Sequence, residues 1–264
     1  MRPYGIMMHA IGNLTDEEYI KKIAELGFSA TFTGPFATDR EQAVLSELLT
    51  KHDVTYETIH APFGHINDIW LDTPEGHEMF RELCDSVDRC AAASVPILVV
   101  HLSSGLNPPS ITDLGRARFT CLVDYAARKG IKIAFENQRW LGNLCWVMEF
   151  LDPNTVGFCW DCGHEACFTP GKQFMPLFGD RLICTHIHDN SCEFNADDHW
   201  LPFDGGVDFD RVTRQIRESG YKGSLMLEVI GFRPRYRDMN VDVYLERAAE
   251  AAKKLVAMTD GGAQ

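Results

Sequence analysis

Two histidines, at 186 and 188, follow a run of mostly apolar residues in the stretch LICTHIHDN at 182–190. Because side chains alternate across a strand, Cys184, His186 and His188 would share one face. Imidazoles gathered in this way could ligate a metal ion or move protons. The simpler interpretation is one buried histidine beside one surface histidine, so the other polar residues of the chain must decide between the two.

Three carboxylates stand at the ends of other apolar runs. Glu136 ends IAFE, Asp161 ends FCWD, and Glu228 follows LML. An isolated acid in apolar surroundings is costly to bury unless it is paired, protonated or bound to a metal. Carboxylates with one imidazole suit a divalent ion such as Mn²⁺, Mg²⁺, Co²⁺ or Zn²⁺. We therefore predict that Glu136, Asp161, His186 and Glu228 bind one divalent cation. The alternative is a buried ion-pair network, for which Arg139 is the nearest arginine outside the last loop.

These side chains need a scaffold that brings distant segments together. Helix-like segments separate β-rich runs that recur roughly every thirty residues, the size of a βα unit. The eight runs cover 4–9, 29–34, 55–61, 96–102, 132–138, 156–162, 182–188 and 224–229. Several are continuously apolar, as in strands buried on both faces of a parallel sheet. The pattern predicts a single (β/α)8 TIM barrel over residues 1–264. An open doubly wound sheet is the alternative, but its nucleotide-binding glycine motifs are absent from the sequence.

Helix signals fill the segments between these runs. Thr15 and Glu18 form a capping box that opens a helix to about Leu26, and Thr73 precedes a proline at a first helical turn. Asp208 can cap a helix that Gly220 ends. Further helices are predicted over 143–151, 173–178 and 241–258.

Most histidines fall where a TIM barrel carries its chemistry, at the carboxyl ends of the strands and in the loops that follow. Only His52 and His77 belong to helical segments. The other eight are His9, His60, His65, His101, His164, His186, His188 and His199. This distribution favours a functional cluster over scattered core histidines.

The net charge of −13 opposes attraction to nucleic acid or to anionic membranes. No apolar run reaches bilayer length and no signal-peptide core follows Met1, so we expect a cytoplasmic protein. The nine cysteines are scattered, which favours packed thiols over a disulfide framework. Cys159 and Cys162 would face opposite sides of a strand, so we do not expect them to share a metal.

Seven motifs in order along the chain together resemble the xylose-isomerase-like TIM barrels. This group includes sugar phosphate isomerases and epimerases and, more distantly, apurinic endonucleases of the endonuclease IV type. The resemblance implies a metal site formed by Glu136, Asp161, His186 and Glu228, the same four residues inferred above. The motifs are HAPFGHIND (60–68), VVHLSSG (99–105), FENQR (135–139), CWDCGH (159–164), THIHDN (185–190), DDHWLPFDGGVDF (197–209) and LEV (227–229).

The endonuclease branch holds more metals, and its additional ligand positions match residues of this chain. The resemblance implies that a second or third zinc could bind at His60, His101, His164, Asp197 and His199. Two features weigh against DNA cleavage. The acidic net charge is one, and the sequence CWDCGH, which departs from the L-D-T-C-H of the endonucleases, is the other.

The resemblance implies a metal-dependent sugar isomerase or epimerase that acts through an enediolate, with Glu136 and Glu228 transferring the proton. A multi-zinc apurinic endonuclease is one alternative, and a keto-sugar or inositol lyase or dehydratase of the same family is another. The expected partner is a small sugar, not a membrane or nucleic acid. The expected sugar contacts are His60, His101, His164, His188, Trp70 and Arg139. His188 could instead orient a metal ligand through a hydrogen bond.

Two loops carry further expectations. Trp70, in PFGHINDIWLD, could stack on the C–H face of a sugar, or the loop could form a hydrophobic plug or a contact between copies in a homo-oligomer. Arg233, Arg235 and Arg237 follow the last predicted strand. They could bind a phosphate or carboxylate on the substrate, or they could face solvent or a second subunit.

Overall fold

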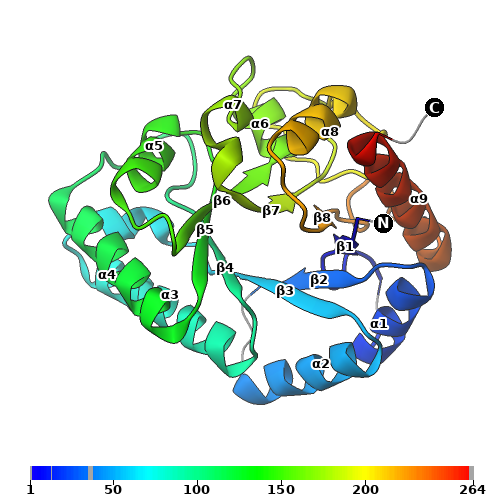
Figure 1. Cartoon of the computed structure of the whole chain (residues 1–264), viewed down its shortest axis with the longest axis horizontal. Coiled ribbons are helices and arrows are strands. Elements are labelled where there is room, and N and C mark those ends of the chain that lie inside the picture. The colour runs from blue at the N-terminus through cyan, green and yellow to red at the C-terminus, as the bar shows by residue number, and fades with distance from the viewer. Residues whose placement is uncertain (1, 13, 35–37, 262–264) are drawn as a thin grey trace.

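A computed structural model describes residues 2–12, 14–34 and 38–261. Its eight strands form one sheet in the order β7-β6-β5-β4-β3-β2-β1-β8. Ile187 pairs with Leu227 just beyond the named strands, which closes the ring between β7 and β8 (Figure 1). The strands are β1 (Tyr4–Ile6), β2 (Ala30–Thr33), β3 (Thr55–His60), β4 (Ile97–Val100), β5 (Lys132–Glu136), β6 (Val156–Asp161), β7 (Leu182–His186) and β8 (Leu225–Leu227). The predicted single (β/α)8 barrel is confirmed, and so is each predicted strand, although each one ends slightly earlier than predicted.

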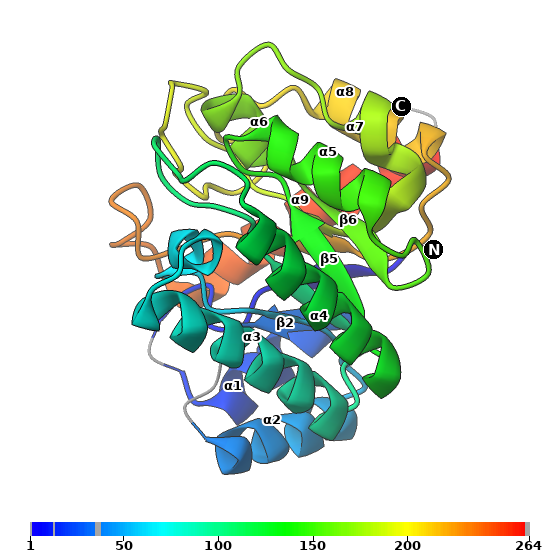
Figure 2. The ribbon, with the colours of Figure 1, turned by 90° about the vertical axis from the view of Figure 1, so that its left-hand side faces the viewer.

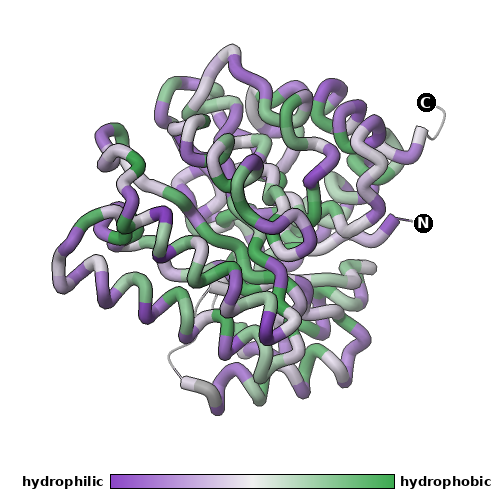
Figure 3. The backbone as a smooth tube through the Cα atoms, turned by 60° about the vertical axis from the view of Figure 1, so that its left-hand side comes forward, coloured by the Kyte–Doolittle hydropathy of each residue, from purple (hydrophilic) through white to green (hydrophobic). Residues whose placement is uncertain are grey.

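Helices surround the ring of strands, and α3 packs beside α4 on one flank (Figure 2). The helices are α1 (Asp16–Glu25), α2 (Asp39–Lys51), η1 (Ile66–Trp70), α3 (Pro74–Ala92), α4 (Asp113–Lys129), α5 (Leu141–Phe150), α6 (Cys162–Phe168), α7 (Met175–Phe178), η2 (Gly179–Arg181), α8 (Phe209–Glu218) and α9 (Val241–Asp260). Hydrophobic residues follow the central strands, whereas the helices alternate between hydrophobic and hydrophilic residues (Figure 3). Within the described residues, none of these helices combines the length and apolar character needed to span a bilayer.

The predicted helix starts are confirmed by their capping contacts. The hydroxyl of Thr15 accepts a hydrogen bond from the Glu18 N–H at 3.3 Å, and the Glu18 carboxylate accepts one from the Thr15 N–H at 2.9 Å. Thr73 caps α3 in the same way through the N–H of Gly76, and Asp208 caps α8. Each cap satisfies N–H groups that have no partner within the helix.

The main departure from the predicted elements lies after β6. The sequence predicted a strand through Cys162, but the strand ends at Asp161 and α6 begins at Cys162. Asp161 Oδ1 accepts a hydrogen bond from the His164 N–H at 2.6 Å, so this carboxylate caps the helix that it precedes. The argument that Cys159 and Cys162 lie on opposite strand faces therefore does not apply, because Cys162 belongs to a helix. All nine cysteines are free thiols, as predicted.

Small apolar side chains fill the interior of the barrel beneath the polar residues at the strand ends. Val99, Ala134, Cys159 and Cys184 form one buried layer inside the ring. Side chains at i and i+2 of a strand share a face, so Glu136, Asp161 and His186 stand directly above the last three members of this layer. Small apolar side chains therefore fill the middle of the barrel and leave the polar residues to close its carboxyl end.

Candidate metal centre

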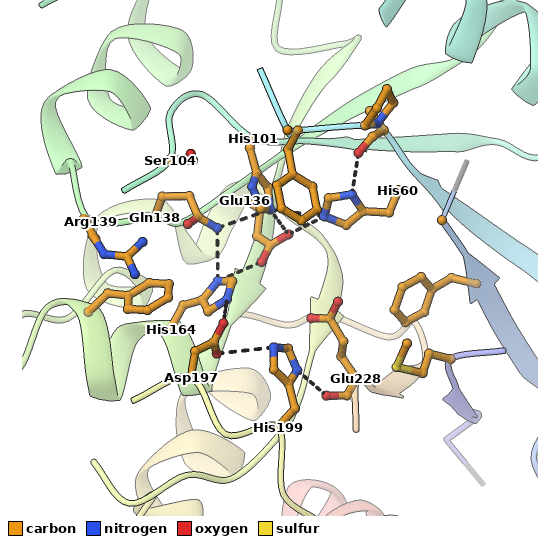
Figure 4. Close-up of a pocket in the computed structure, with 18 residues that line it drawn as sticks. His60, His101, Ser104, Glu136, Gln138, Arg139, His164, Asp197, His199 and Glu228 are labelled. Atoms are coloured by element: carbon orange, nitrogen blue, oxygen red, sulfur yellow. Dashed lines mark hydrogen bonds and ion pairs between the residues drawn. The ribbon is translucent and has the colours of Figure 1, made fainter. Parts of the chain in front are cut away.

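A cavity of about 510 Å³ opens at the carboxyl ends of the strands. This is the end of the barrel that carries the active site in TIM-barrel enzymes. Its polar side chains point toward a common space (Figure 4). The polar residues that line it are His60, His101, Ser104, Glu136, Gln138, Arg139, His164, Asp197, His199 and Glu228.

Most of the histidines assigned to strand ends gather at this site, but two do not. The His9 side chain is 50% exposed and lies 2.8 Å from Asp16. The His65 side chain is 74% exposed and lies 3.4 Å from Asp68. Both turn outward to pair with an acid at the start of the next helix, so the expectation that they join the cluster was wrong. The members of the cluster are His60, His101, His164, His186, His188 and His199.

The structure brings together the four residues predicted to bind one cation. Their candidate ligand atoms, from Glu136, Asp161, His186 and Glu228, all lie within 4.8 Å of one another. His186 Nδ1 is 3.1 Å from Glu228 Oε2 and 3.4 Å from Glu136 Oε2. Donor atoms this close can reach a shared ion through coordination bonds of about 2 Å. We name these four residues the quartet; its binding of a cation stays a prediction.

The hydrogen bonding of the quartet fits a divalent cation. Asp161 Oδ2, Glu228 Oε2 and both ring nitrogens of His186 are buried and make no hydrogen bond within the described part of the chain. Buried polar atoms that lack a hydrogen bond are costly and uncommon. An ion held by one oxygen or nitrogen from each residue would satisfy the two carboxylate oxygens and one nitrogen of His186, and the oxygen-rich donor set suits a divalent metal with open positions.

Charges within the quartet are strongly coupled. Burial raises the pKa of Glu136, but His101 and His186 outweigh burial and hold it well below its usual value. Burial lowers the pKa of His186, but Glu228 and Glu136 hold it well above its usual value. Protonated His186 can therefore balance these carboxylates when no cation is bound. Arg139 forms no ion pair with the quartet among the described residues, so it is not part of the ion-pair network considered as an alternative.

A second group of donors shares Glu136 with the quartet. The Nε2 atoms of His60 and His101 are 3.1 Å apart, and each lies 3.2 Å from Glu136 Oε2. Gln138 Nε2 lies 3.2 Å from the same His101 nitrogen. Because Glu136 belongs to both groups, two neighbouring cations could share this carboxylate.

A third group is centred on Asp197. Its Oδ2 lies 3.5 Å from His164 Nε2, and its Oδ1 lies 3.3 Å from His199 Nε2 and 3.6 Å from His188 Nε2. Burial alone would raise the pKa of Asp197, but contacts with His164 and His199 lower it far below its usual value. Asp197 in turn raises the pKa of His199 to about 9, against the effect of burial. The sequence pointed to three of these residues as additional ligands, and the structure adds His188.

His188 does not line the cavity, so its position does not support a sugar contact and fits the alternative that it orients a metal ligand. It is fully buried and stacks on His199, with ring centroids 4.0 Å apart. Its Nε2 lies 3.2 Å from Asp161 Oδ1. A Cβ added at Gly163 would lie 2.1 Å from the His188 ring, so α6 packs directly against the imidazole. His188 therefore contacts the carboxylates of Asp161 and Asp197 from a buried position outside the cavity lining.

Replacing Gly163 with alanine should displace His188, because the added methyl group and the ring cannot occupy the same space. We expect Gly163→Ala to lower the affinity of the purified protein for Zn²⁺ by about tenfold or more, as disturbed outer-shell partners commonly do. A competition titration with a chelating dye measures this affinity. Gly142→Ala is the matched control, because a Cβ there meets no atom within 4 Å. Equal affinity in the two variants would contradict the supporting role of His188.

Trp70 is not the stacking surface that the sequence suggested. Only 1% of it is exposed, and its indole N–H donates to the Leu102 carbonyl at 2.8 Å. Its ring packs against Phe119 and Trp146. The η1 turn points the indole of Trp70 into the core. Gly115 of α4 has no side chain, and this leaves space for the indole ring. Trp70 is therefore a core residue, consistent with the hydrophobic plug considered as an alternative.

The cavity wall also contains aromatic and polar residues that the sequence did not single out as sugar contacts. Phe63 is 47% exposed and lies 4.5 Å from the His101 ring, and Phe168 also lines the cavity. Gln138 bridges His101 and His164. The signal for Gln138 was available, because it follows Glu136 by two positions and so continues the same face.

Arg233 and Arg235, which follow β8, contact loop residues and lie outside the cavity. Arg233 donates to the Asp197 carbonyl at 3.1 Å. Arg235 lies over the Trp200 ring at 4.5 Å and 3.9 Å from Asp204. Neither lines the cavity. The suggestion that they bind an anionic substrate group is therefore not supported by their positions.

Asp189 organises the loop that carries Asp197 and His199. It is fully buried, and its carboxylate accepts hydrogen bonds from the N–H groups of Asn190, Gly205 and Val207 at 2.7–2.9 Å. These N–H groups lie at the two ends of the loop, so one carboxylate joins its start to its finish. Two backbone hydrogen bonds between Asp189 and Trp200 reinforce this closure.

Uncharacterized proteins of two organisms are similar to this chain in sequence. An uncharacterized protein of Sinorhizobium fredii is 43% identical over 161 residues, which cover 55% of this chain and 51% of that relative. The chain thus spans about half the length of this relative. An uncharacterized protein of Methanocaldococcus jannaschii is 24% identical over 261 residues, which cover 89% of this chain and 87% of the relative.

Solved structures with the same fold include several epimerases. A D-tagatose 3-epimerase-like protein superposes with a TM-score of 0.77 at 21% identity, covering 99% of both chains. D-psicose 3-epimerase from Clostridium cellulolyticum H10 gives a TM-score of 0.80 at 15% identity, covering 98% of this chain and 99% of that chain. Residues 20–258 match the sequence model of a family described as xylose isomerase-like TIM barrel. The chain therefore belongs to the xylose isomerase-like TIM barrel family.

Proposed function

We propose that the protein is a divalent-metal-dependent isomerase or epimerase of a small sugar or sugar phosphate. One observation carries the proposal: Glu136 and Glu228 both line the cavity, and both converge with Asp161 and His186 on one point. Two carboxylates beside a cation are what proton transfer next to a carbonyl requires. The solved D-psicose 3-epimerase of the same fold supports the choice of substrate class.

The two glutamates divide the proton transfer between them. The quartet would hold a divalent ion, which would supply Lewis-acid chemistry beside a sugar carbonyl, and the carbon next to that carbonyl then loses its proton to the protein. Glu228, with 15% of its side chain exposed against 1% for Glu136, accepts that proton. His164, whose Nδ1 lies 2.9 Å from Glu136 Oε1, supplies the proton that ionised Glu136 passes on to the opposite face of the carbon. Opposite-face return inverts the carbon, whereas return by Glu228 to the adjacent carbon isomerises the sugar.

Solvent exchange tests this proposal. The purified protein is incubated in D₂O with a panel of ketoses and their phosphates, and deuterium at C2 and C3 is followed by NMR. We expect incorporation that stops when a chelator removes the metal and resumes when Mn²⁺ or Co²⁺ is restored. Loss of water from the product would instead identify a lyase or dehydratase, which shares the first proton transfer. No exchange with any sugar in the presence of metal would overturn the proposal.

A second candidate function is supported by the two further donor groups. His60 and His101 with Glu136, and His164, His188 and His199 with Asp197, could hold a second and a third zinc. This number of sites is what the resemblance to endonuclease IV-type apurinic endonucleases implies. The acidic net charge of −13 weighs against a DNA substrate.

Metal content separates the two candidates. We expect about one tightly bound divalent ion per chain by elemental analysis, held by the quartet. Three zinc ions per chain together with cleavage of an oligonucleotide containing an abasic site would favour the endonuclease. A cytoplasmic location and a homo-oligomeric state remain predictions.

A further inference from the structure

We propose that the substrate carries an oxyanion, a phosphate or a carboxylate, and that Arg139 binds it at the edge of the cavity. This inference rests on the proposed function and narrows its substrate class. Arg139 is the one arginine or lysine among the described residues that line the cavity. It lies on the side where Gln138 and His164 lie, across the cavity from Glu228 (Figure 4). A sugar held there by its anionic end would extend toward the quartet.

The guanidinium of Arg139 is held in place before any ligand arrives. It stacks on Phe168, with its central carbon 3.4 Å from the ring centroid. Its Nε donates to Asn195 Oδ1 at 2.9 Å, and its Nη2 donates to the same oxygen. Asn195 is itself fixed, because its N–H donates to the Cys167 carbonyl at 2.8 Å. Little side-chain entropy is then lost on binding, which favours a specific ligand over a chance contact.

The outer edge of this guanidinium is free to bind a ligand. An arginine has five N–H donors, and the Asn195 oxygen takes the Nε–H and one N–H of Nη2. The Nη1 group makes no hydrogen bond to the described residues, and Arg139 forms no ion pair with them. Other arginines of this fold do have carboxylate partners, such as Arg211 with Glu165 and Arg247 with Asp204.

The ligand that suits this edge is a planar or tetrahedral oxyanion. Parallel N–H groups of a guanidinium match two oxygens of a carboxylate or phosphate, and such charged pairs are among the strongest hydrogen bonds in proteins. Arg139 is half-buried, and burial lowers its pKa. The nearby Asp197 opposes this shift but is engaged by the histidines of its own group. An anion from the substrate would supply the missing partner.

Binding of inorganic phosphate and of acetate to the metal-loaded protein tests the inference by calorimetry. We expect Arg139→Gln to weaken binding of the preferred anion by about tenfold or more, as expected for loss of a charged hydrogen-bonding partner. Arg139→Lys should bind the anion with an affinity between those of the parent and Arg139→Gln, because lysine keeps the positive charge but lacks the paired N–H groups of the guanidinium. Asn195→Ala keeps the guanidinium but removes its clamp, so it should weaken binding by a smaller factor. Arg128→Gln, which removes the same charge from the end of α4, should bind as the parent does.

Each outcome bears on the proposal. An effect confined to phosphate assigns a sugar phosphate, and an effect confined to acetate assigns a sugar acid. Equal affinities of the parent and Arg139→Gln for both anions, or no binding of either anion to the parent, would overturn the anion site. The titration needs no turnover, so these results would leave the isomerase proposal to its own deuterium test. Failure of that test would likewise leave the anion site standing.

Discussion

Replacing Glu228 with glutamine should abolish deuterium exchange into the substrate. The amide has nearly the same shape but cannot accept the proton from carbon, and it is a weaker metal ligand. General-base catalysis alone contributes about 10²–10⁴-fold, so we expect at least that loss in the exchange rate. The measurement is NMR of the sugar in D₂O, with metal content determined on the same sample. The metal content must be known because Glu228 belongs to the quartet as well as to the proposed mechanism, so its replacement could stop exchange through loss of the metal.

The control for this experiment is Glu149→Gln, which makes the same chemical change on an exposed position of α5. It should exchange at the parent rate. The decisive sample is Glu228→Gln that has been reloaded with metal. If that sample still exchanges at a rate near that of the parent, Glu228 has no part in the proton transfer.

Replacing Glu136 with glutamine should remove bound metal more completely than any other single change. Glu136 is a member of the quartet and of the group formed with His60 and His101. It also contacts His164 at 2.9 Å. Its loss would leave these buried imidazoles without their common carboxylate, and a cation there would face a surplus of positive charge. We expect the metal content to approach zero and the exchange rate to fall by about a thousandfold or more.

Elemental analysis and thermal melting with and without metal check this prediction. Binding of a metal stabilises the folded state in proportion to the logarithm of its concentration over Kd, so the parent should melt higher when Mn²⁺ is added. The melting temperature of Glu136→Gln should not rise when Mn²⁺ is added. Asp197→Asn is the informative comparison, because Asp197 lies outside the quartet and Mn²⁺ should still raise the melting temperature of that variant. A normal metal content in Glu136→Gln would show that Glu136 is not the shared ligand.

The sequence predicted the barrel well because its signals are local and repeated. The strands are β-rich runs, several of them continuously apolar, with helix signals between them, and Thr15, Thr73 and Asp208 cap helices through contacts within three residues. The quartet could be predicted for the same reason. Strand alternation and the common direction of parallel strands place a polar residue at each strand end on one side of the barrel.

The errors arose where a side chain's direction depends on tertiary contacts. Trp70 and Phe63 lie in one loop, yet the η1 turn buries the first and leaves the second beside the cavity. The sequence left His188 either at the substrate or behind a metal ligand, and the packing of α6 favours the second. Helix α6 itself went unpredicted because Asp161 acts as both strand end and helix cap. The contact of Arg139 with Asn195 joins positions 56 residues apart, so no local pattern encodes it.

The Asp189 carboxylate has a consequence for how this site could change over evolution. It ties residues 190, 205 and 207 together, and its backbone pairs with Trp200. Between these anchors lies Asn195, which holds Arg139, and the same loop carries Asp197 and His199. Substitutions of Asn195 would change how Arg139 is presented to a substrate while the quartet, which lies outside this loop, keeps its place, so homologues with a different residue there are the natural place to look for new substrates.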